Sequence, residues 1–72
     1  MLKDTIRKFV LANAYEHNGK AQPGAIIGKL IGADAISKTE IGKTMPLINK
    51  IIAEVSKLSL AVQEKELRKV FP

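Results

Sequence analysis

A turn rich in lysine and amide side chains, followed by the start of a helix, is the part of this chain best suited to chemistry. Lys20 stands shortly before Pro23, and proline is favoured in the first turn of a helix. The free N–H groups and the dipole at a helix N-terminus favour a phosphate, so Lys20 and these amides could bind one together. Asn18 and Gln22 can add neutral hydrogen bonds to phosphate or ribose, and Lys29 projects from the same helix.

Two further lysines extend this surface if the third helix packs beside that helix. With them, the predicted nucleic-acid contacts are Asn18, Lys20, Gln22, Lys29, Lys43 and Lys50. Contacts of this kind position an RNA backbone without reading its bases. For each lysine alone, a solvated surface position is the alternative interpretation.

No residue pattern typical of a catalytic or metal site is present in the sequence. The chain has no cysteine and one histidine, His17, for which a structural or polar-surface role is the simplest interpretation. The segment from Gly24 to Leu30 has the spacing Gly-x3-Gly-Lys-Leu, whereas a phosphate loop needs Gly-x4-Gly-Lys followed by Ser or Thr after a strand. No pair of acids stands beside a histidine that could act as a base. We therefore expect no catalytic residue, metal or cofactor in this chain.

Length and composition favour one small domain with a polyanionic partner. A chain of 72 residues forms one domain at most, and its net charge of +5 suits either nucleic-acid binding or simple solubility. Hydrophobic residues make up 46% of the chain but only 4% are aromatic, which predicts an aliphatic core. With the three aromatic residues mostly assigned to that core, base stacking is not expected. No apolar run approaches the roughly 18 residues that cross a membrane, and the lack of cysteine fits a reducing, cytoplasmic setting.

Glycines recur at every fourth residue in the helix that follows Pro23. Gly24, Gly28 and Gly32 lie on one side of this helix. Because an interior glycine costs roughly 1 kcal/mol relative to alanine, the repeat calls for a reason. We expect close packing against a neighbouring helix, and the alternative is the approach of an RNA or ligand backbone.

Hydrophobic periodicity predicts an all-α fold, a compact bundle of four to five short helices without a sheet. The first helix spans about Asp4 to His17, ends at Asn18-Gly19, and is apolar on more than one side, as expected of a central helix. A connection with a short helical turn from Asp34 leads to a helix over about 37–45. Pro46 then either begins a new helix or kinks a continuous one, which ends at about 57–59.

The last predicted helix begins after a serine cap and ends near the C-terminus. Ser59 caps a helix over about 60–71, and Glu64 and Arg68 form a favourable pair four residues apart. The positions expected to face the core are Leu60, Gln63 or Glu64, Leu67, Val70 and Phe71.

The turn and glycine repeat together resemble a known family. Residues 19–32 read Gly-Lys-Ala-x-Pro-Gly-Ala-x-Ile-Gly-Lys-x-Ile-Gly and follow a helix reading Lys-Phe-Val-Leu-Ala-Asn-Ala-Tyr-Glu-His-Asn. This wording resembles the N-terminal appended domain of archaeal-type glutamyl-tRNA synthetases, and residues 46–59 look like that domain's long helix. The chain is also similar, more weakly, to the helical tail module of tRNA-dependent amidotransferases. It departs from such relatives at Leu60, where they have proline after the serine.

The resemblance implies that residues 1–72 are a single, non-catalytic helical domain, cut from the N-terminus of a larger, cytoplasmic glutamate–tRNA ligase. Its partners would be tRNA and the catalytic body of the parent enzyme, with no membrane involved. ATP and glutamate would bind to that body, since signatures of the His-Ile-Gly-His and Lys-Met-Ser-Lys kind do not occur here. The only similar string, Lys43-Thr44-Met45, lacks the Ser-Lys that would complete it. We therefore expect the isolated chain to be inactive.

A protein-docking module is the alternative function. Such a module would pack on the catalytic body or recruit a partner without touching RNA. It predicts an exposed apolar patch and little salt-dependent RNA affinity, whereas tRNA binding predicts a basic surface and affinity that falls with salt.

Overall fold

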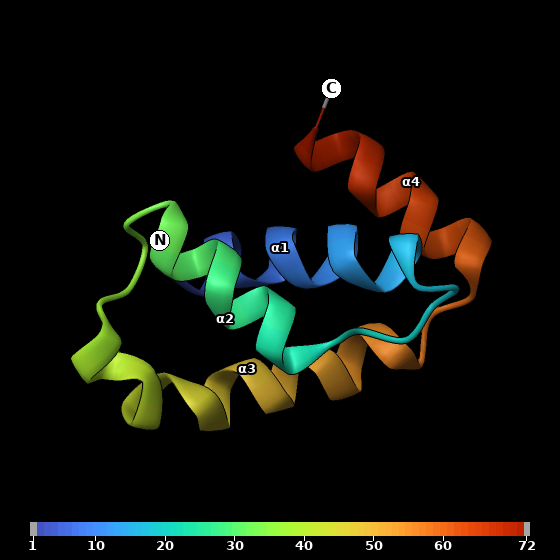
Figure 1. Cartoon of the computed structure of the whole chain (residues 1–72). Coiled ribbons are helices and arrows are strands. Elements are labelled where there is room, and N and C mark those ends of the chain that lie inside the picture. The colour runs from blue at the N-terminus through green and yellow to red at the C-terminus, as the bar shows by residue number, and fades with distance from the viewer. Residues whose placement is uncertain (1, 72) are drawn as a thin grey trace.

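The computed structural model describes residues 2–71, which form helices joined by short connections (Figure 1). The elements are α1 (Leu2–Glu16), α2 (Pro23–Gly32), the 3-10 helix η1 (Lys38–Glu40), α3 (Ile41–Ser56) and α4 (Leu60–Val70). No strand occurs in this described part of the chain. The predicted all-α class is confirmed.

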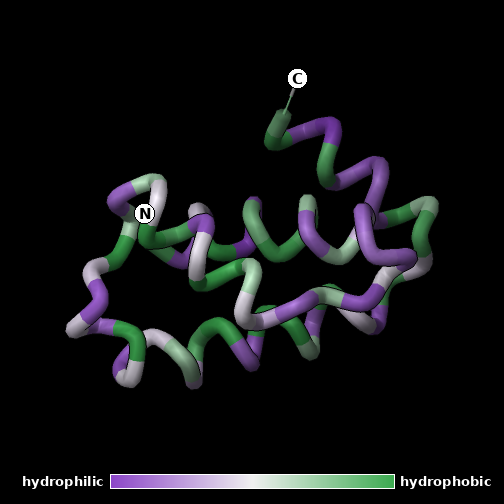
Figure 2. The backbone as a smooth tube through the Cα atoms, in the orientation of Figure 1, coloured by the Kyte–Doolittle hydropathy of each residue, from purple (hydrophilic) through white to green (hydrophobic). Residues whose placement is uncertain are grey.

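Helix α1 is the central element of the fold. It packs against α2, α3 and α4, and in Figure 1 it lies between α3 and α4. Figure 2 shows hydrophobic and hydrophilic residues alternating along the helices, as expected when each helix buries one side. The buried core is aliphatic and consists of Ile6, Val10, Leu11, Ala14, Ile26, Leu30, Ile36, Ile48, Ile51 and Val55. Burying one Leu or Ile side chain contributes about 1.5–3 kcal/mol, so these residues hold the helices together.

The end of α1 is closed by residues in the left-handed conformation. Asn18 has a φ of 58° and Gly19 a φ of 91°, and the Gly19 N–H donates to the Ala14 carbonyl at 2.7 Å. This is the geometry of a Schellman motif. The stop predicted at Asn18-Gly19 is confirmed.

Helix α2 ends in the same way, at Asp34, where the sequence predicts the beginning of a helical turn. Asp34 has a φ of 57°, and the N–H of Ala35 donates to the Leu30 carbonyl at 2.9 Å. The prediction of a helical turn beginning at Asp34 is wrong, because Asp34 adopts the left-handed conformation that ends α2. Asp is one of the few residues other than glycine that tolerates it.

Helix α3 is continuous through its proline. Pro46 lies inside α3 and cannot donate a hydrogen bond to the Gly42 carbonyl, but the helix runs on to Ser56. The α-helix begins at Ile41, later than predicted, because residues 38–40 form the tighter η1 turn. The two predicted segments on either side of Pro46 are therefore one helix.

A carboxylate holds the turn that leads into α3. The Glu40 Oε1 atom accepts hydrogen bonds from the backbone N–H and the hydroxyl of Ser37, both at 2.9 Å. The Ser37 backbone bond, the Ser37 hydroxyl and the nearby Lys43 charge all favour the ionised form and hold the pKa of Glu40 below its ordinary value.

This hydrogen-bonded carboxylate makes the turn dependent on pH. Because the pKa is lowered on folding, its stabilising contribution is present above the unfolded pKa and disappears as the pH falls through the folded pKa. We expect Glu40→Gln to lower the melting temperature at about pH 7, with a difference from the parent that shrinks toward about pH 3. Thermal unfolding across this range checks it, with Glu54→Gln, at an exposed α3 carboxylate, as the matched control. A Glu40→Gln difference that stays constant with pH would contradict the prediction.

Helix α4 is attached along one narrow side. Ser59 caps it by accepting from the Val62 N–H at 3.3 Å, as predicted. Only Gln63 is fully buried, while Leu67 and Val70 are half-buried. Leu60 and Phe71 are exposed, so their predicted inward orientation is wrong. Helix α4 packs chiefly against α1, and one neighbour covers too little of its surface to bury them.

Candidate nucleic-acid interface

The connection between α1 and α2 carries three of the predicted contact residues. Asn18, Lys20 and Gln22 are all exposed there. A buried residue of α1 positions this loop: the Asn13 side chain is 2% exposed, and its Oδ1 atom accepts from the Gln22 N–H at 2.5 Å. The Gln22 side chain donates to the Lys20 carbonyl at 3.4 Å. The loop is therefore tied to the core at its last residue before α2.

Asn13 is the positioning residue that sequence reasoning missed. A polar residue at an inward position of an amphipathic helix was the available signal, because a buried amide needs hydrogen-bond partners. His17 has a structural contact in the same region, since its Nδ1 atom lies 2.7 Å from the Asn13 carbonyl oxygen.

The N-terminus of α2 is open to solvent. Pro23 occupies the first turn as predicted, and Gln22 makes no side-chain cap. Pro23 and Gly24 are both exposed. The backbone donors that follow Pro23 thus have no side-chain cap to compete with an incoming anion.

The glycine repeat lies on the solvent side of α2. Gly24, Gly28 and Gly32 are exposed, and a Cβ atom added at any of them would meet nothing within 4 Å. The predicted packing of these glycines against another helix is therefore wrong for the described chain. The reason is geometric: Ile26 and Leu30 turn the opposite side of α2 into the core. At 100° per residue, Lys29 falls beside the glycine side and is also exposed.

Because nothing packs on it, Gly28 can be replaced at no steric cost. We expect Gly28→Ala to raise the free energy of unfolding by about 0.5–1 kcal/mol, since alanine restricts the unfolded chain and favours the helix. Urea unfolding followed by circular dichroism measures the change. Gly19→Ala is the matched control and should destabilise, because Gly19 has a φ of 91° and a new Cβ would lie 3.4 Å from Leu60. A loss of stability in Gly28→Ala would contradict the open environment of this residue.

The remaining two predicted residues lie on a different helix. Lys43 and Lys50 are exposed on α3, which packs against α2. They are two turns apart and lie on the same side of α3. Of the six predicted residues, four therefore lie on the connection between α1 and α2 or on α2 itself, and two lie on the outer side of α3. In the described part of the chain none of the four lysines forms a salt bridge, because both ion pairs found there lie within α4.

Chemically, this surface can bind an anion but offers little else. It presents lysines that form no salt bridge within residues 2–71, an open helix N-terminus and neutral amide groups. Over residues 2–71 there is no group of three or more His, Asp or Glu residues that could hold a metal ion. None of the helices in that range is long and apolar enough to cross a membrane.

Comparison with known proteins gives one consistent result. The chain is 39% identical over 71 residues to a glutamate–tRNA ligase of Thermococcus kodakarensis, a match that covers 99% of the chain and 12% of the relative. It is 43% identical over 65 residues to the glutamate–tRNA ligase of Pyrococcus furiosus, covering 90% of the chain and 11% of the relative. The ligase of Nitrosopumilus maritimus is 38% identical over 71 residues, again 99% of the chain and 12% of the relative.

The two other comparisons found nothing. No protein-family model matches the chain, and no solved structure does. The chain thus spans about 12% of the length of the curated relatives it matches, and it corresponds to a small all-helical piece of them.

Proposed function

This chain is a relative of the archaeal glutamate–tRNA ligases over a small part of their length, and from that relationship we propose that it is a non-catalytic, N-terminal domain that contacts the tRNA backbone. The observation that carries the proposal is the match over 90–99% of the chain to enzymes that act on tRNA. The chemistry of the surface agrees with it, since its exposed groups suit phosphate. Joining glutamate to tRNA with ATP would belong to the remainder of the enzyme, in the cytoplasm.

In this proposal the loop and α2 form the main contact. Lys20 and the open N-terminus of α2 hold one phosphate, and Lys29 reaches a second one along the helix. The glycine side, which presents no side chain beyond Cα at three positions, lets a sugar and phosphate approach the α2 backbone closely. The wide, shallow minor groove of an RNA helix displays 2′-hydroxyl groups that suit such an approach. Asn18 and Gln22 add neutral hydrogen bonds, and Lys43 and Lys50 extend the contact over α3.

The test is a titration of the isotope-labelled chain with unmodified tRNA, followed by amide NMR at about 0.05 M and about 0.2 M salt. We expect shifts centred on residues 20–29 that weaken with salt. Replacing Lys20 and Lys29 together by alanine should reduce the slope of log K against log salt by about 2, or about 1 for each phosphate contact. The matched control for Lys20→Ala and Lys29→Ala taken singly is Lys38→Ala, which likewise removes one positive charge, from η1. If all lysine variants lost the same amount of affinity for tRNA, only non-specific charge attraction would remain, and the proposed contact surface would be wrong.

A steric variant tests the role of the glycine side. Gly28→Gln introduces a good helix former with a long, neutral side chain at a position with free space around it. If RNA approaches α2 there, the variant keeps its fold and loses affinity for tRNA. Unchanged affinity would exclude contact at the glycine side.

A docking module remains the second candidate, and the uncovered glycine side of α2 favours it. Small residues allow close approach of another protein helix as readily as of RNA. Flat amide spectra with tRNA, together with shifts on adding the catalytic body of a related ligase, would replace the tRNA proposal with this one.

A further inference from the structure

Two of the three aromatic side chains, Tyr15 and Phe71, lie on the surface, although most of the aromatic residues were expected in the core. Tyr15 is 38% exposed and Phe71 is 46% exposed. With Ala12 and Leu67 they form the apolar part of a hollow of about 390 Å³ between α1 and α4. Our reason for excluding base stacking was the expected burial of the aromatics, and this reason does not hold for Tyr15 and Phe71.

Two cationic groups lie near the aromatic part of the hollow. The Lys8 ammonium lies 4.5 Å from the centroid of the Phe71 ring, and Arg68 lines the hollow. A guanidinium has five donors, so Arg68 can keep its 2.7 Å bond to Glu64 and still bind a phosphate.

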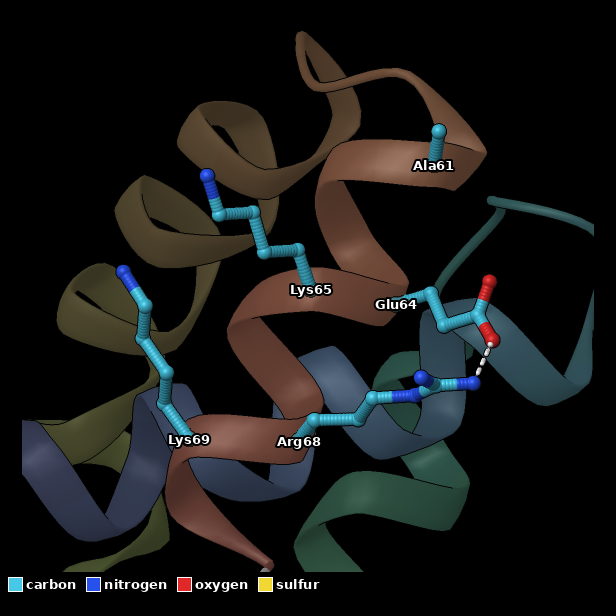
Figure 3. Close-up of a pocket in the computed structure, with 5 residues that line it drawn as sticks. All are labelled: Ala61, Glu64, Lys65, Arg68 and Lys69. Carbon is cyan, nitrogen blue, oxygen red and sulfur yellow. Dashed lines mark hydrogen bonds and ion pairs between the residues drawn. The ribbon is translucent and has the colours of Figure 1, made fainter.

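A second hollow of about 380 Å³ adjoins the first along α4. The two share Glu64 and Arg68, and the second adds Lys65 and Lys69. Figure 3 shows Lys65 and Lys69 extending side by side, one turn apart, while Arg68 reaches the other way to Glu64. Lys69 also has a loose 3.7 Å contact with Glu66. Stacking surfaces bordered by a row of cations are the combination that single-stranded nucleic acid requires.

Two carboxylates line the hollow, and the one without an ion pair in the described part of the chain can discriminate among bases. Glu16 lines the hollow and has no ion pair within residues 2–71. A carboxylate repels phosphate but accepts hydrogen bonds from an exocyclic amino group, as found with cytosine. Uracil has no such group.

We propose that the hollow between α1 and α4 binds one unpaired RNA nucleotide whose base carries an exocyclic amino group. The base packs on Tyr15 and Phe71, its amino group donates to Glu16, and its phosphate meets Arg68. This inference rests on the proposed function, because it takes RNA as the partner. It adds a second contact, made through a base, on helices other than α2.

The test uses the small number of aromatic residues in the chain. Its rings are Phe9, Tyr15, Phe71 and the imidazole of His17, so their protons can be followed individually by NMR. During titration with single-stranded oligoadenylate, we expect the ring protons of Tyr15 and Phe71 to shift upfield while half-buried Phe9 stays unchanged. Oligouridylate should bind more weakly, and Glu16→Gln should remove most of that difference.

Substitutions separate stacking from general charge attraction. Tyr15→Leu and Phe71→Leu should each weaken oligoadenylate binding by about 5- to 100-fold, the usual range for one stacked base. Tyr15→Phe keeps the ring and should bind like the parent. Tyr15→Leu binding as tightly as the parent, or shifts confined to residues 20–29, would overturn the proposal.

The outcomes distinguish this site from the proposed function. If tRNA binding depends on Lys20 and Lys29 while no oligonucleotide moves Tyr15, the hollow is not a nucleotide site and the tRNA proposal stands. If neither tRNA nor any oligonucleotide binds, both proposals fail. Ring shifts caused only by another protein would identify the hollow as a protein contact and refute nucleotide binding.

Discussion

Replacing Gln63 by alanine is expected to lower the free energy of unfolding by about 2–4 kcal/mol. Gln63 is 1% exposed, and its Nε2 atom donates to the carbonyls of Val55 at 3.1 Å and Leu58 at 3.2 Å. Val55 lies in the last turn of α3, where carbonyls lack the regular helical donor, and Leu58 follows the helix. The Val55 carbonyl also accepts from the Leu58 N–H at 3.0 Å. The substitution leaves both without that donor and opens a cavity between helices. For a domain this small, such a loss is a large fraction of a total of about 4–11 kcal/mol.

A second substitution at the same position separates hydrogen bonding from volume. The Gln63 Oε1 atom is buried and has no hydrogen-bond partner among residues 2–71, which is an energetic cost that a methionine does not have. Gln63→Met should therefore be less destabilising than Gln63→Ala, by filling the space and removing the unpaired oxygen. Urea unfolding of the three proteins measures this. If both variants were as stable as the parent, Gln63 would not join α3 to α4.

The second large effect is expected for Asn13→Ala, at about 1–3 kcal/mol. The substitution removes the acceptor of the Gln22 N–H and so releases the loop that carries Lys20. Amide hydrogen exchange measures this directly, because the Gln22 amide should lose its protection while the core of α3 keeps most of its own. The proposed tRNA affinity should fall as well, since the loop then pays an ordering cost on binding.

Lys3→Ala is the matched control for Asn13→Ala, as an exposed substitution on the same helix. It should change the free energy of unfolding by no more than about 0.5 kcal/mol. If the Gln22 amide stays protected in Asn13→Ala, another group holds the loop, and Asn13 is only a core residue.

For the candidate site, sequence reasoning predicted the residues but not the way in which the fold holds them. All six predicted contact residues are exposed, and the loop and α2 carry four of them. Lys43 and Lys50 lie on α3. Their position relative to α2 could not be predicted, because helical spacing does not tell which side of one helix faces another. Whether the six bind RNA stays a prediction. The aromatic hollow was missed, because apolar residues near the end of a helix are exposed or buried according to how many neighbours cover them.

The sequence by itself determined the helices and most of their ends. Local backbone geometry and hydrogen bonds between residues close in sequence set the helix ends at Pro23, Asn18-Gly19 and Ser59. The roles of these residues can therefore be derived without knowing the fold. Only the tertiary structure decided which helix sides are covered. It left Gly24, Gly28 and Gly32 facing solvent, buried Gln63 and exposed Phe71. The physical reason is that burial depends on contacts between helices far apart in the chain, about which a local pattern carries no information.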